Sequence, residues 1–270
     1  MKKITVKTDK IGKYKHLNKT QARVTGKEII ISEPTQIVNE EGVLLVHYDY
    51  IPKQINKSIH KELQQIKFIK STRKSGLATE SVIFGFSPRD MVKGLSCRLS
   101  KWHDAQKKIH NKFCHYAGEF DILYKKLFPE LHKQHNQVLN KEILPCYRIP
   151  KTTYTSGIIN KTNGLLYHTD NGNYKGYRSC MMYHEIGEIS GGELSFPELN
   201  LLFKFQDSTY IFFDGATLLH GVCPIKKTHK SERYTTVFYT LEGLKQGLEP
   251  VEEMKYMESR NHVKFLTKDT

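Results

Sequence analysis

The sequence predicts an α+β fold in which a jelly-roll β core is backed by helices from the N-terminal half. Two observations lead to this expectation. Between residues 146 and 241, short β-branched and aromatic runs are separated by turn residues, and no helical pattern intervenes. Between about Ser96 and Asn140, apolar residues recur at every third or fourth position, which is typical of amphipathic helices.

The N-terminal half is expected to be an arm followed by helical support. Residues 1–36 are polar and rich in lysine, and further segments are predicted from periodicity and turn residues. These are a strand at 28–32, a strand at 42–48, a helix at 53–68, a loop at 71–94 that carries Lys74-Ser75-Gly76 and a short strand at 84–86, and a helical stretch at 96–140 broken at Pro129.

The C-terminal half supplies the β core, with strands predicted at 152–160, 177–185, 192–196, 201–205, 208–213, 218–222 and 234–240. The charged tail from Glu242 to Thr270 is expected to form a short helix and a frayed end. We therefore expect one domain, with the arm and helical support over 1–145, the β core over 146–241 and the tail over 242–270.

The charge of the chain favours polyanionic partners. It has 42 Lys and Arg against 28 Asp and Glu, which gives a net charge of +14.

The five cysteines of the chain form no CxxC pair, which indicates reduced thiols in the cytoplasm or nucleus. No signal peptide and no apolar run long enough to span a membrane is found, so we expect an intracellular monomer without membrane attachment.

A candidate metal site lies in Tyr167-His168-Thr169-Asp170, with His220 about fifty residues downstream. In a chain with this many His and Asp residues, about 0.5 His-x-Asp triplets are expected by chance, so the triplet alone is weak evidence. His47-Tyr48-Asp49 has the same pattern. However, strand alternation lets His168 and Asp170 project to one side, and His220 lies near the start of a strand that can pair beside them. Two imidazoles and one carboxylate that leave half an octahedron open are typical of a non-haem Fe(II) site.

A candidate anion site lies on the next strand, at Arg233. A buried guanidinium recognises a carboxylate through a bidentate fork, so a dicarboxylate co-substrate would explain this residue. The alternative is an ordinary surface arginine at a strand edge.

These residues together resemble the Fe(II)/2-oxoglutarate-dependent dioxygenases, whose fold is a double-stranded β-helix. The resemblance is carried by His168-x-Asp170, His220, Arg233 with Thr235, and Gly191-Gly192-Glu193-Leu194. Within that superfamily the chain is most similar to the TET and JBP nucleobase oxygenases. The segments that carry this closer resemblance are Tyr154–Asn160, Phe84–Arg89 and Leu218–Ile225.

The resemblance implies roles for single residues. His168, Asp170 and His220 would ligate Fe(II), and Arg233 with Thr235 would hold the distal carboxylate of 2-oxoglutarate. Asn160 is the candidate for the other end of the co-substrate, and a plain turn residue is its alternative. O2 and 2-oxoglutarate would yield CO2 and succinate, and ascorbate stays open as another reductive partner.

The implied substrate is the 5-methyl group of thymine or 5-methylcytosine in DNA, which must be flipped out of the duplex to reach the iron. Two alternatives stay open: a prolyl-hydroxylase-like oxygenase that acts on a protein or amino acid, and a DNA-binding module without metal. Candidate substrate contacts are Arg89, Tyr147, Arg148, Tyr174, Lys175 and Arg178.

Overall fold

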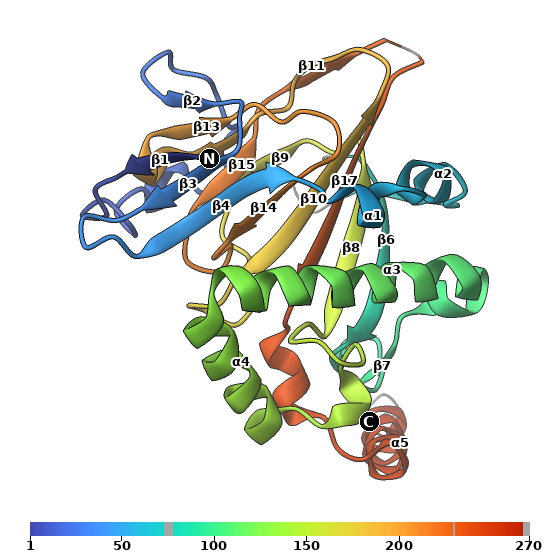
Figure 1. Ribbon diagram of the computed structural model, residues 1–270. Coiled ribbons are helices and arrows are strands. Elements are labelled where there is room, and N and C mark those ends of the chain that lie inside the picture. Colours follow the sequence, from blue (N-terminus) through green and yellow to red (C-terminus); the bar gives the residue numbers. More distant parts are fainter. Residues whose placement is uncertain (73–77, 229, 267–270) are drawn as a thin grey trace. The chain divides into compact units, whose positions relative to one another are not determined.

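The computed structural model describes residues 1–72, 78–228 and 230–266. The chain folds into two compact units. The first holds Met1–Val82 and Ile158–Phe238, and the second holds Ile83–Gly157 and Tyr239–Thr270. Strands make up most of the first unit, and helices are prominent in the second (Figure 1). This mixed content confirms the predicted α+β class.

The first unit is built on a large, mainly antiparallel sheet. Its strands follow the order β1-β3-β4-β14-β10-β17-β8-β6-β5, and β6, β8 and β17 continue into the second unit. Only the pairing of β1 with β3 is parallel among the pairs whose register is defined in this sheet. The bounds are β1 Lys2–Thr5, β3 Thr35–Val38, β4 Leu44–Tyr50, β5 Ile69–Thr72, β6 Ala78–Ser87, β8 Ser156–Lys161, β10 Ser179–Ile186, β14 Thr209–Phe213 and β17 Glu232–Tyr239.

A smaller sheet completes the first unit, in the order β2-β13-β12-β15-β9. Its bounds are β2 Ile29–Ile31, β9 Leu165–His168, β12 Leu194–Phe196, β13 Leu201–Phe203 and β15 His220–Val222, and a separate pair is formed by β11 Ile189–Gly191 and β16 Ile225–Lys227.

The apolar core of this unit lies between the two sheets. Ile37, Val46 and Ile211 come from the large sheet, whereas Phe196 and Phe203 come from the small one, and all five are fully buried in one cluster. Burying such side chains contributes roughly 1.5–3 kcal/mol each before the entropy of folding is counted. The two sheets therefore enclose one core, which is the layered arrangement of a jelly roll.

The N-terminal arm is part of this unit rather than a loose extension. The backbone N–H of Lys19 donates to the carbonyl of Tyr167 at 2.7 Å, and the N–H of Tyr167 donates to the carbonyl of Thr20 at 2.9 Å. The strand predicted at 28–32 is confirmed as β2, which pairs with β13 in parallel. Strands β1 and β3 were not expected from the polar sequence of the arm.

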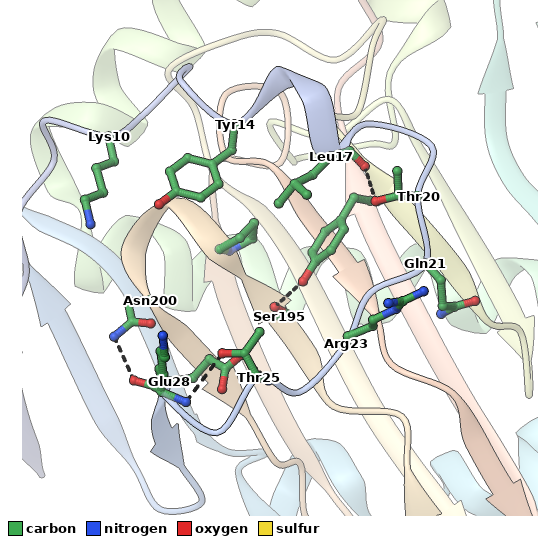
Figure 2. Close-up of a pocket in the computed structure, with 13 residues that line it drawn as sticks. Lys10, Tyr14, Leu17, Thr20, Gln21, Arg23, Thr25, Glu28, Ser195 and Asn200 are labelled. Carbon is green, nitrogen blue, oxygen red and sulfur yellow. Dashed lines mark hydrogen bonds between the residues drawn. The ribbon is translucent and has the colours of Figure 1, made fainter.

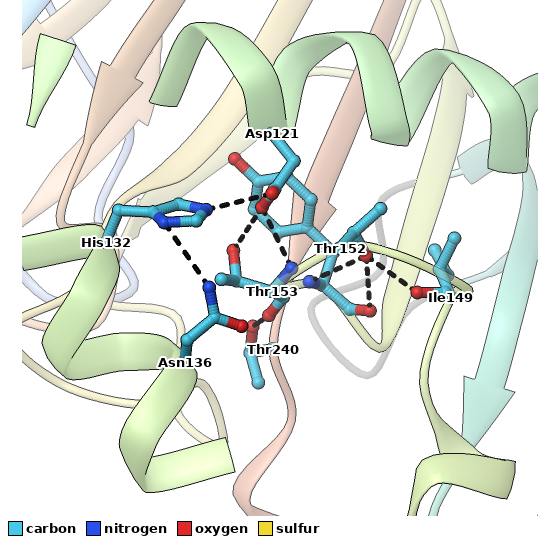
Figure 3. A network of polar contacts seen from close by, with 8 residues as sticks. Asp121, His132, Asn136, Ile149, Thr152, Thr153 and Thr240 are labelled. Carbon is cyan, nitrogen blue, oxygen red and sulfur yellow. Dashed lines mark hydrogen bonds and ion pairs between the residues drawn. The ribbon is translucent and has the colours of Figure 1, made fainter. Parts of the chain in front are cut away.

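The second unit contains the helices α3 (Lys101–Leu127) and α4 (Pro129–Glu142), which confirm the predicted helical stretch and its break at Pro129. A buried polar network ties them to neighbouring segments (Figure 3). The Asp121 carboxylate lies 2.9 Å from His132 Nε2 and accepts from both the backbone N–H and the hydroxyl of Thr153. Thr240 then donates to the Thr153 carbonyl. Asp121 is thus a structural anchor, because it satisfies three donors that would otherwise be buried without partners.

A second buried carboxylate in this unit is Glu253 on α5 (Pro250–Leu266), which connects α5 to other segments of the unit. It forms a two-oxygen ion pair with Arg89 at 2.7 and 2.5 Å, and it accepts from the backbone N–H groups of Cys97 and Leu248. Burial alone would raise the pKa of Glu253, but these hydrogen bonds outweigh it and lower the pKa to about 2.

This pair predicts acid sensitivity of the second unit. Because the folded-state pKa of Glu253 is depressed, its stabilisation is present above the unfolded pKa of about 4.3 and is lost as the pH falls toward about 2. We expect Glu253 to contribute about 3 kcal/mol at neutral pH, estimated from the shift at about 1.4 kcal/mol per pKa unit. Glu253→Gln should lower the unfolding free energy at pH 7 and flatten its fall between pH 5 and 3 in urea titrations. An unchanged slope would contradict this role.

Several segment predictions need correction. The loop predicted at 71–94 is wrong over 78–83, because β6 runs from Ala78 to Ser87, whereas the short strand predicted at 84–86 is part of β6 and is confirmed. Lys74-Ser75-Gly76 lies outside the described residues. The helix predicted at 53–68 is two short helices, α1 (Lys53–Asn56) and α2 (Ile59–Gln64). The predicted C-terminal helix is α5, and residues 267–270 lie outside the described part. None of the described helices has the length and apolar character needed to cross a membrane.

Candidate metal centre and co-substrate site

Two neighbouring strands of the small sheet bring the candidate histidines together. His168 ends β9 and His220 begins β15, and the antiparallel register of these strands places the two residues directly opposite each other. Their ring centroids lie 4.4 Å apart. The prediction that His220 begins a strand beside the one that carries His168 is therefore confirmed.

Both imidazoles are held in the same way by the backbone. Nδ1 of His168 lies 2.8 Å from the carbonyl of Leu166, and Nδ1 of His220 lies 2.9 Å from the carbonyl of Leu218. A carbonyl only accepts, so each Nδ1 carries the proton and each Nε2 presents its lone pair. This is the tautomer that a metal ligand requires.

The third group, Asp170, lies where these lone pairs converge. Its Oδ1 is 3.5 Å from His168 Nε2 and 3.8 Å from His220 Nε2. Ligand atoms of all three residues lie within 4.8 Å of one another, a spacing that leaves room for an ion among them. Two imidazole nitrogens and one carboxylate oxygen suit Fe(II) and leave positions open for other ligands.

The surroundings of His220 keep it neutral and rigid. The ring packs against Phe213 and Phe196 at centroid distances of 5.1 and 6.0 Å. Burial lowers the pKa of His220, and the Asp170 carboxylate offsets part of that shift. The imidazole is therefore available as a neutral ligand near pH 7.

The turn after β14 positions Asp170. Its backbone N–H donates to the Gly215 carbonyl at 2.8 Å, and a Cβ added at Gly215 would lie 2.3 Å from Asp170 Oδ2. Asp214 fixes this turn because its carboxylate accepts from the N–H groups of Ala216, Thr217 and Gly176. Gly215 thus leaves the space that the Asp170 carboxylate occupies.

Gly215→Ala should therefore push the Asp170 carboxylate away from the histidines. We expect iron affinity to fall by about 10- to 100-fold, the range that loss of a ligand-orienting contact causes. Equilibrium titration with Fe(II) under anaerobic conditions measures this loss. Gly164→Ala is the matched control, because a Cβ there meets no atom within 4 Å. Equal iron affinity in the two variants would contradict the positioning role.

Arg233 lies on β17 and is buried, with 2% of its surface exposed, so the surface-arginine alternative is wrong. Its guanidinium lies 5.1 Å from the centre of the Tyr183 ring, and Nη2 donates to the Gly192 carbonyl at 3.2 Å. Nε is buried and has no hydrogen-bond partner among the residues that the structure describes. Burial lowers the pKa of Arg233, and a bound carboxylate would compensate this desolvated cation.

The glycine pair before β12 makes room for that guanidinium. Gly191 and Gly192 have φ angles of 75° and 74°, in the left-handed region that favours glycine. A Cβ at Gly192 would lie 3.3 Å from Arg233 Nε. Glycine adopts these positive φ angles without strain, so the backbone can pass close to Arg233 here.

Asn160 and Thr235 are both buried and lie side by side, with Asn160 Nδ2 3.5 Å from the Thr235 hydroxyl. Asn160 Oδ1 also accepts from Ser81 and from Asn163, at 2.9 and 3.0 Å. The amide thus belongs to a polar network, of which sequence reasoning had named only Asn160 and Thr235. Co-substrate binding by Asn160 and Thr235 stays a prediction.

Three candidate substrate residues have structural partners within the second unit. Arg89 pairs with Glu253, the Tyr147 hydroxyl donates to the Leu248 carbonyl at 2.8 Å, and the Arg148 guanidinium binds the carbonyls of Leu139 and Ile143 at the end of α4. These contacts explain the three side chains without a substrate, and their substrate role stays a prediction.

The other three candidates lie in the first unit. Tyr174 and Arg178 are buried, and Arg178 donates to the carbonyls of Gly176 and Leu44. Lys175 is exposed and lines a cavity of about 390 Å³. Residues on both sides of Asp170, together with Leu219 beside His220, also line this cavity. Lys175 is thus the candidate placed best for a ligand near the metal residues.

Sequence reasoning missed one buried acid beside this cavity, Glu198. Its carboxylate accepts from the N–H of Gly12 at 2.7 Å and from the N–H of Leu219 at 3.1 Å. It therefore joins the arm to the residue that precedes His220. No local pattern could reveal this, because Gly12 lies 186 positions away.

The second His-x-Asp triplet of the sequence, His47-Tyr48-Asp49, has different surroundings. His47 is buried on β4, and its Nε2 lies 3.2 Å from the Tyr210 hydroxyl and 3.8 Å from Asp49. Among the described residues, only His168, Asp170 and His220 form a group that could hold a metal ion.

A fold and site of this kind define a class of non-haem iron oxygenases, and comparison with known proteins agrees. Residues 89–242, more than half of the chain, match the model of the Tet_JBP family, the oxygenase domain of the 2OGFeDO superfamily. The chain therefore belongs to the Tet_JBP family of Fe(II)- and 2-oxoglutarate-dependent dioxygenases. Fe(II) and 2-oxoglutarate are accordingly its cofactor and co-substrate.

Comparison with solved structures gives one fold of sufficient similarity, that of NgTET1, and two weaker likenesses. NgTET1, solved in complex with 5mC DNA, is similar with a TM-score of 0.54 and 15% identity over 82% of this chain and 84% of that one. The viral collagen prolyl hydroxylase vCPH from Paramecium Bursaria Chlorella virus-1 has a TM-score of 0.35 and 15% identity over 72% of this chain and 96% of its own. A 2OG-Fe(II) oxygenase family protein from Burkholderia pseudomallei has a TM-score of 0.38 and 12% identity, over 72% and 85%. No curated protein sequence matches the chain. The likeness to NgTET1 confirms the predicted double-stranded β-helix.

Proposed function

We propose that this chain hydroxylates the 5-methyl group of thymine or 5-methylcytosine in DNA, with 2-oxoglutarate and O2 converted to succinate and CO2. The observation that carries the proposal is the convergence of His168 Nε2, His220 Nε2 and the Asp170 carboxylate in a member of the Tet_JBP family. The net charge of +14 and the likeness to NgTET1, which was solved with methylated DNA, support DNA as the substrate.

In this proposal the protein supplies the ligands and the position of each reactant. His168, Asp170 and His220 hold the metal, and their backbone contacts fix the ring orientation. Bound Fe(II) with 2-oxoglutarate supplies the oxidising chemistry. Arg233 holds the distal carboxylate of the co-substrate through its buried Nε and Nη groups, with Thr235 beside it. The apolar residues around His220 limit access of water.

The cavity beside Asp170 is the proposed entrance for the substrate. Its volume of about 390 Å³ lies within the range of roughly 300–1,000 Å³ that small-ligand sites occupy. Lys15 and Lys175 supply two positive charges, whereas Glu198 is engaged with backbone N–H groups. A flipped nucleotide needs such cations for its flanking phosphates.

The experiment that tests the proposal measures products directly. The protein is incubated with Fe(II), 2-oxoglutarate and one of three substrates: 5-methylcytosine DNA, thymine-containing DNA without methylcytosine, or a proline-rich peptide. Mass spectrometry of nucleosides and peptides is combined with succinate assay. Hydroxymethyl products in either DNA sample, absent for Asp170→Ala, support the proposal. Hydroxylated peptide with unmodified DNA would contradict it and favour the prolyl-hydroxylase-like alternative.

Lys175 offers a separate test of DNA binding. Lys175→Ala should weaken DNA binding and reduce the slope of log Kd against log salt by about one, because one phosphate contact is lost. Fluorescence anisotropy over a salt series measures both quantities. Lys204→Ala is the control, because Lys204 is exposed and does not line this cavity. The same slope in both variants would contradict the role of Lys175.

A further inference from the structure

A larger cavity lies on the small sheet beneath the N-terminal arm, and neither the metal site nor the proposed substrate entrance uses it (Figure 2). Its volume is about 730 Å³. It is lined by arm residues between Lys10 and Glu28 and by sheet residues that include Tyr167 and Ser195. We call the cavity that these residues line the arm cavity.

The arm cavity lies behind the strands that carry the metal ligands. The Tyr167 hydroxyl and the Ser195 hydroxyl are hydrogen-bonded at 2.9 Å. Tyr167 precedes His168 on β9, and successive strand residues point to opposite faces of a sheet. Ser195 pairs with Gly221, the residue after His220. A ligand in the arm cavity would therefore lie across the small sheet from the iron, too far to react there.

The electrostatics of the arm cavity favour an anion. Lys10, Arg23 and Lys27 are exposed, and their side chains make no hydrogen bond or ion pair with the other described residues. The one acid, Glu28, instead accepts from the N–H groups of Thr25 and Gly26 at 2.8 and 2.9 Å. Three cations thus face the cavity against one carboxylate that is already committed to a backbone turn.

The remaining lining suits a planar ring. Tyr14 is half-buried and stacks on His16 at 5.7 Å, and it lines the same space as the cations (Figure 2). Aromatic faces bind nucleobases by stacking, which contributes about 1–3 kcal/mol per base. The side chain of Gln21 also lines the cavity. Its Nε2 donates to the carbonyls of Ala22 and Val222 at 3.4 Å, so its Oε1 is the atom that would accept from a base edge.

From these observations we infer that the arm cavity is a non-catalytic binding site for a phosphate-bearing ligand with an aromatic base, either a free nucleotide or one nucleotide of a nucleic acid strand. Lys10, Arg23 and Lys27 contact the phosphate, and Tyr14 stacks on the base. The site goes beyond the proposed oxidation, because it neither includes nor opens onto the metal ligands.

The test measures binding by the full chain without Fe(II) or 2-oxoglutarate, so its result does not depend on base oxidation. The probes are fluorescent deoxyadenosine monophosphate and a fluorescent single-stranded oligonucleotide. Arg23→Glu and Tyr14→Leu are compared with the wild type and with Lys204→Glu, which changes net charge by the same amount as Arg23→Glu. We expect each cavity variant to weaken binding at least about tenfold relative to that control, or about 1.4 kcal/mol.

Each outcome decides the inference. A loss for the mononucleotide supports the site with a free nucleotide as its ligand, and a loss for the oligonucleotide alone supports it with a nucleic acid strand. No binding of either probe by the wild type, or equal affinity in the cavity variants and Lys204→Glu, overturns it. Thermal unfolding of each variant shows that it is folded, and Lys10→Ala, at an exposed position, provides a second variant if Tyr14→Leu unfolds.

Discussion

Asp170→Ala is expected to abolish iron binding and oxygenase turnover. The substitution removes the only carboxylate among the three converging groups and leaves two neutral imidazoles, which hold a divalent cation poorly. We expect succinate formation to fall by more than about 100-fold, beyond the effect of losing a ligand-orienting contact. Iron content after anaerobic loading and the rate of succinate formation measure the two effects.

The chain offers a matched control for this prediction. Asp49 stands in the same His-x-Asp sequence pattern, but it lies on β4, where His47 contacts Tyr210 instead of a second histidine. Asp49→Ala should therefore keep wild-type iron content and turnover. Iron bound equally well by Asp170→Ala and the wild type would contradict the assignment of the metal site.

Arg233→Ala is expected to raise the KM for 2-oxoglutarate strongly while iron binding is kept. Truncating one partner of a buried charge pair costs about 2–5 kcal/mol, or roughly 30-fold or more in affinity. The Nη2 contact to the Gly192 carbonyl holds the guanidinium in place, and the buried Nε is the donor that a bound carboxylate would satisfy. Succinate formation across a range of 2-oxoglutarate concentrations measures the change.

Arg233→Lys separates charge from geometry. Lysine keeps a cation but not the planar fork, so its KM should lie between those of the wild type and the alanine variant. An unchanged KM in both variants would show that the co-substrate carboxylate binds elsewhere. Circular dichroism of both variants tests whether the buried substitution has disturbed the fold.

Local patterns in the sequence were enough to predict which three residues meet at the candidate metal site. The His-x-Asp spacing predicted that His168 and Asp170 lie together, although β9 was not among the predicted strands and Asp170 lies two residues beyond its end. The strand predicted at 218–222 placed His220 beside His168. The glycine pair at 191 and 192, which carries part of the family resemblance, has positive φ angles at both positions. These features depend on residues that are neighbours in the chain or on adjacent strands.

Contacts between distant residues could not be predicted in the same way. Arg89 follows a turn and was interpreted as a substrate contact, but its partner Glu253 lies 164 positions away. Glu198 joins Leu219, 21 positions away, to Gly12, which lies 186 positions away. Only residues 84–86 of β6 were predicted as a strand, whereas the structure extends this strand over Ala78–Ser87. Such pairs depend on tertiary packing, which spacing alone does not encode.

The most direct test of the central claim is a crystal structure of the protein with Fe(II) and 2-oxoglutarate, collected under anaerobic conditions with anomalous scattering at the iron edge. We expect one iron peak bonded to His168 Nε2, His220 Nε2 and an Asp170 oxygen, with the distal carboxylate of 2-oxoglutarate on Arg233. An iron peak away from these three side chains, or a co-substrate that does not reach Arg233, would contradict the account.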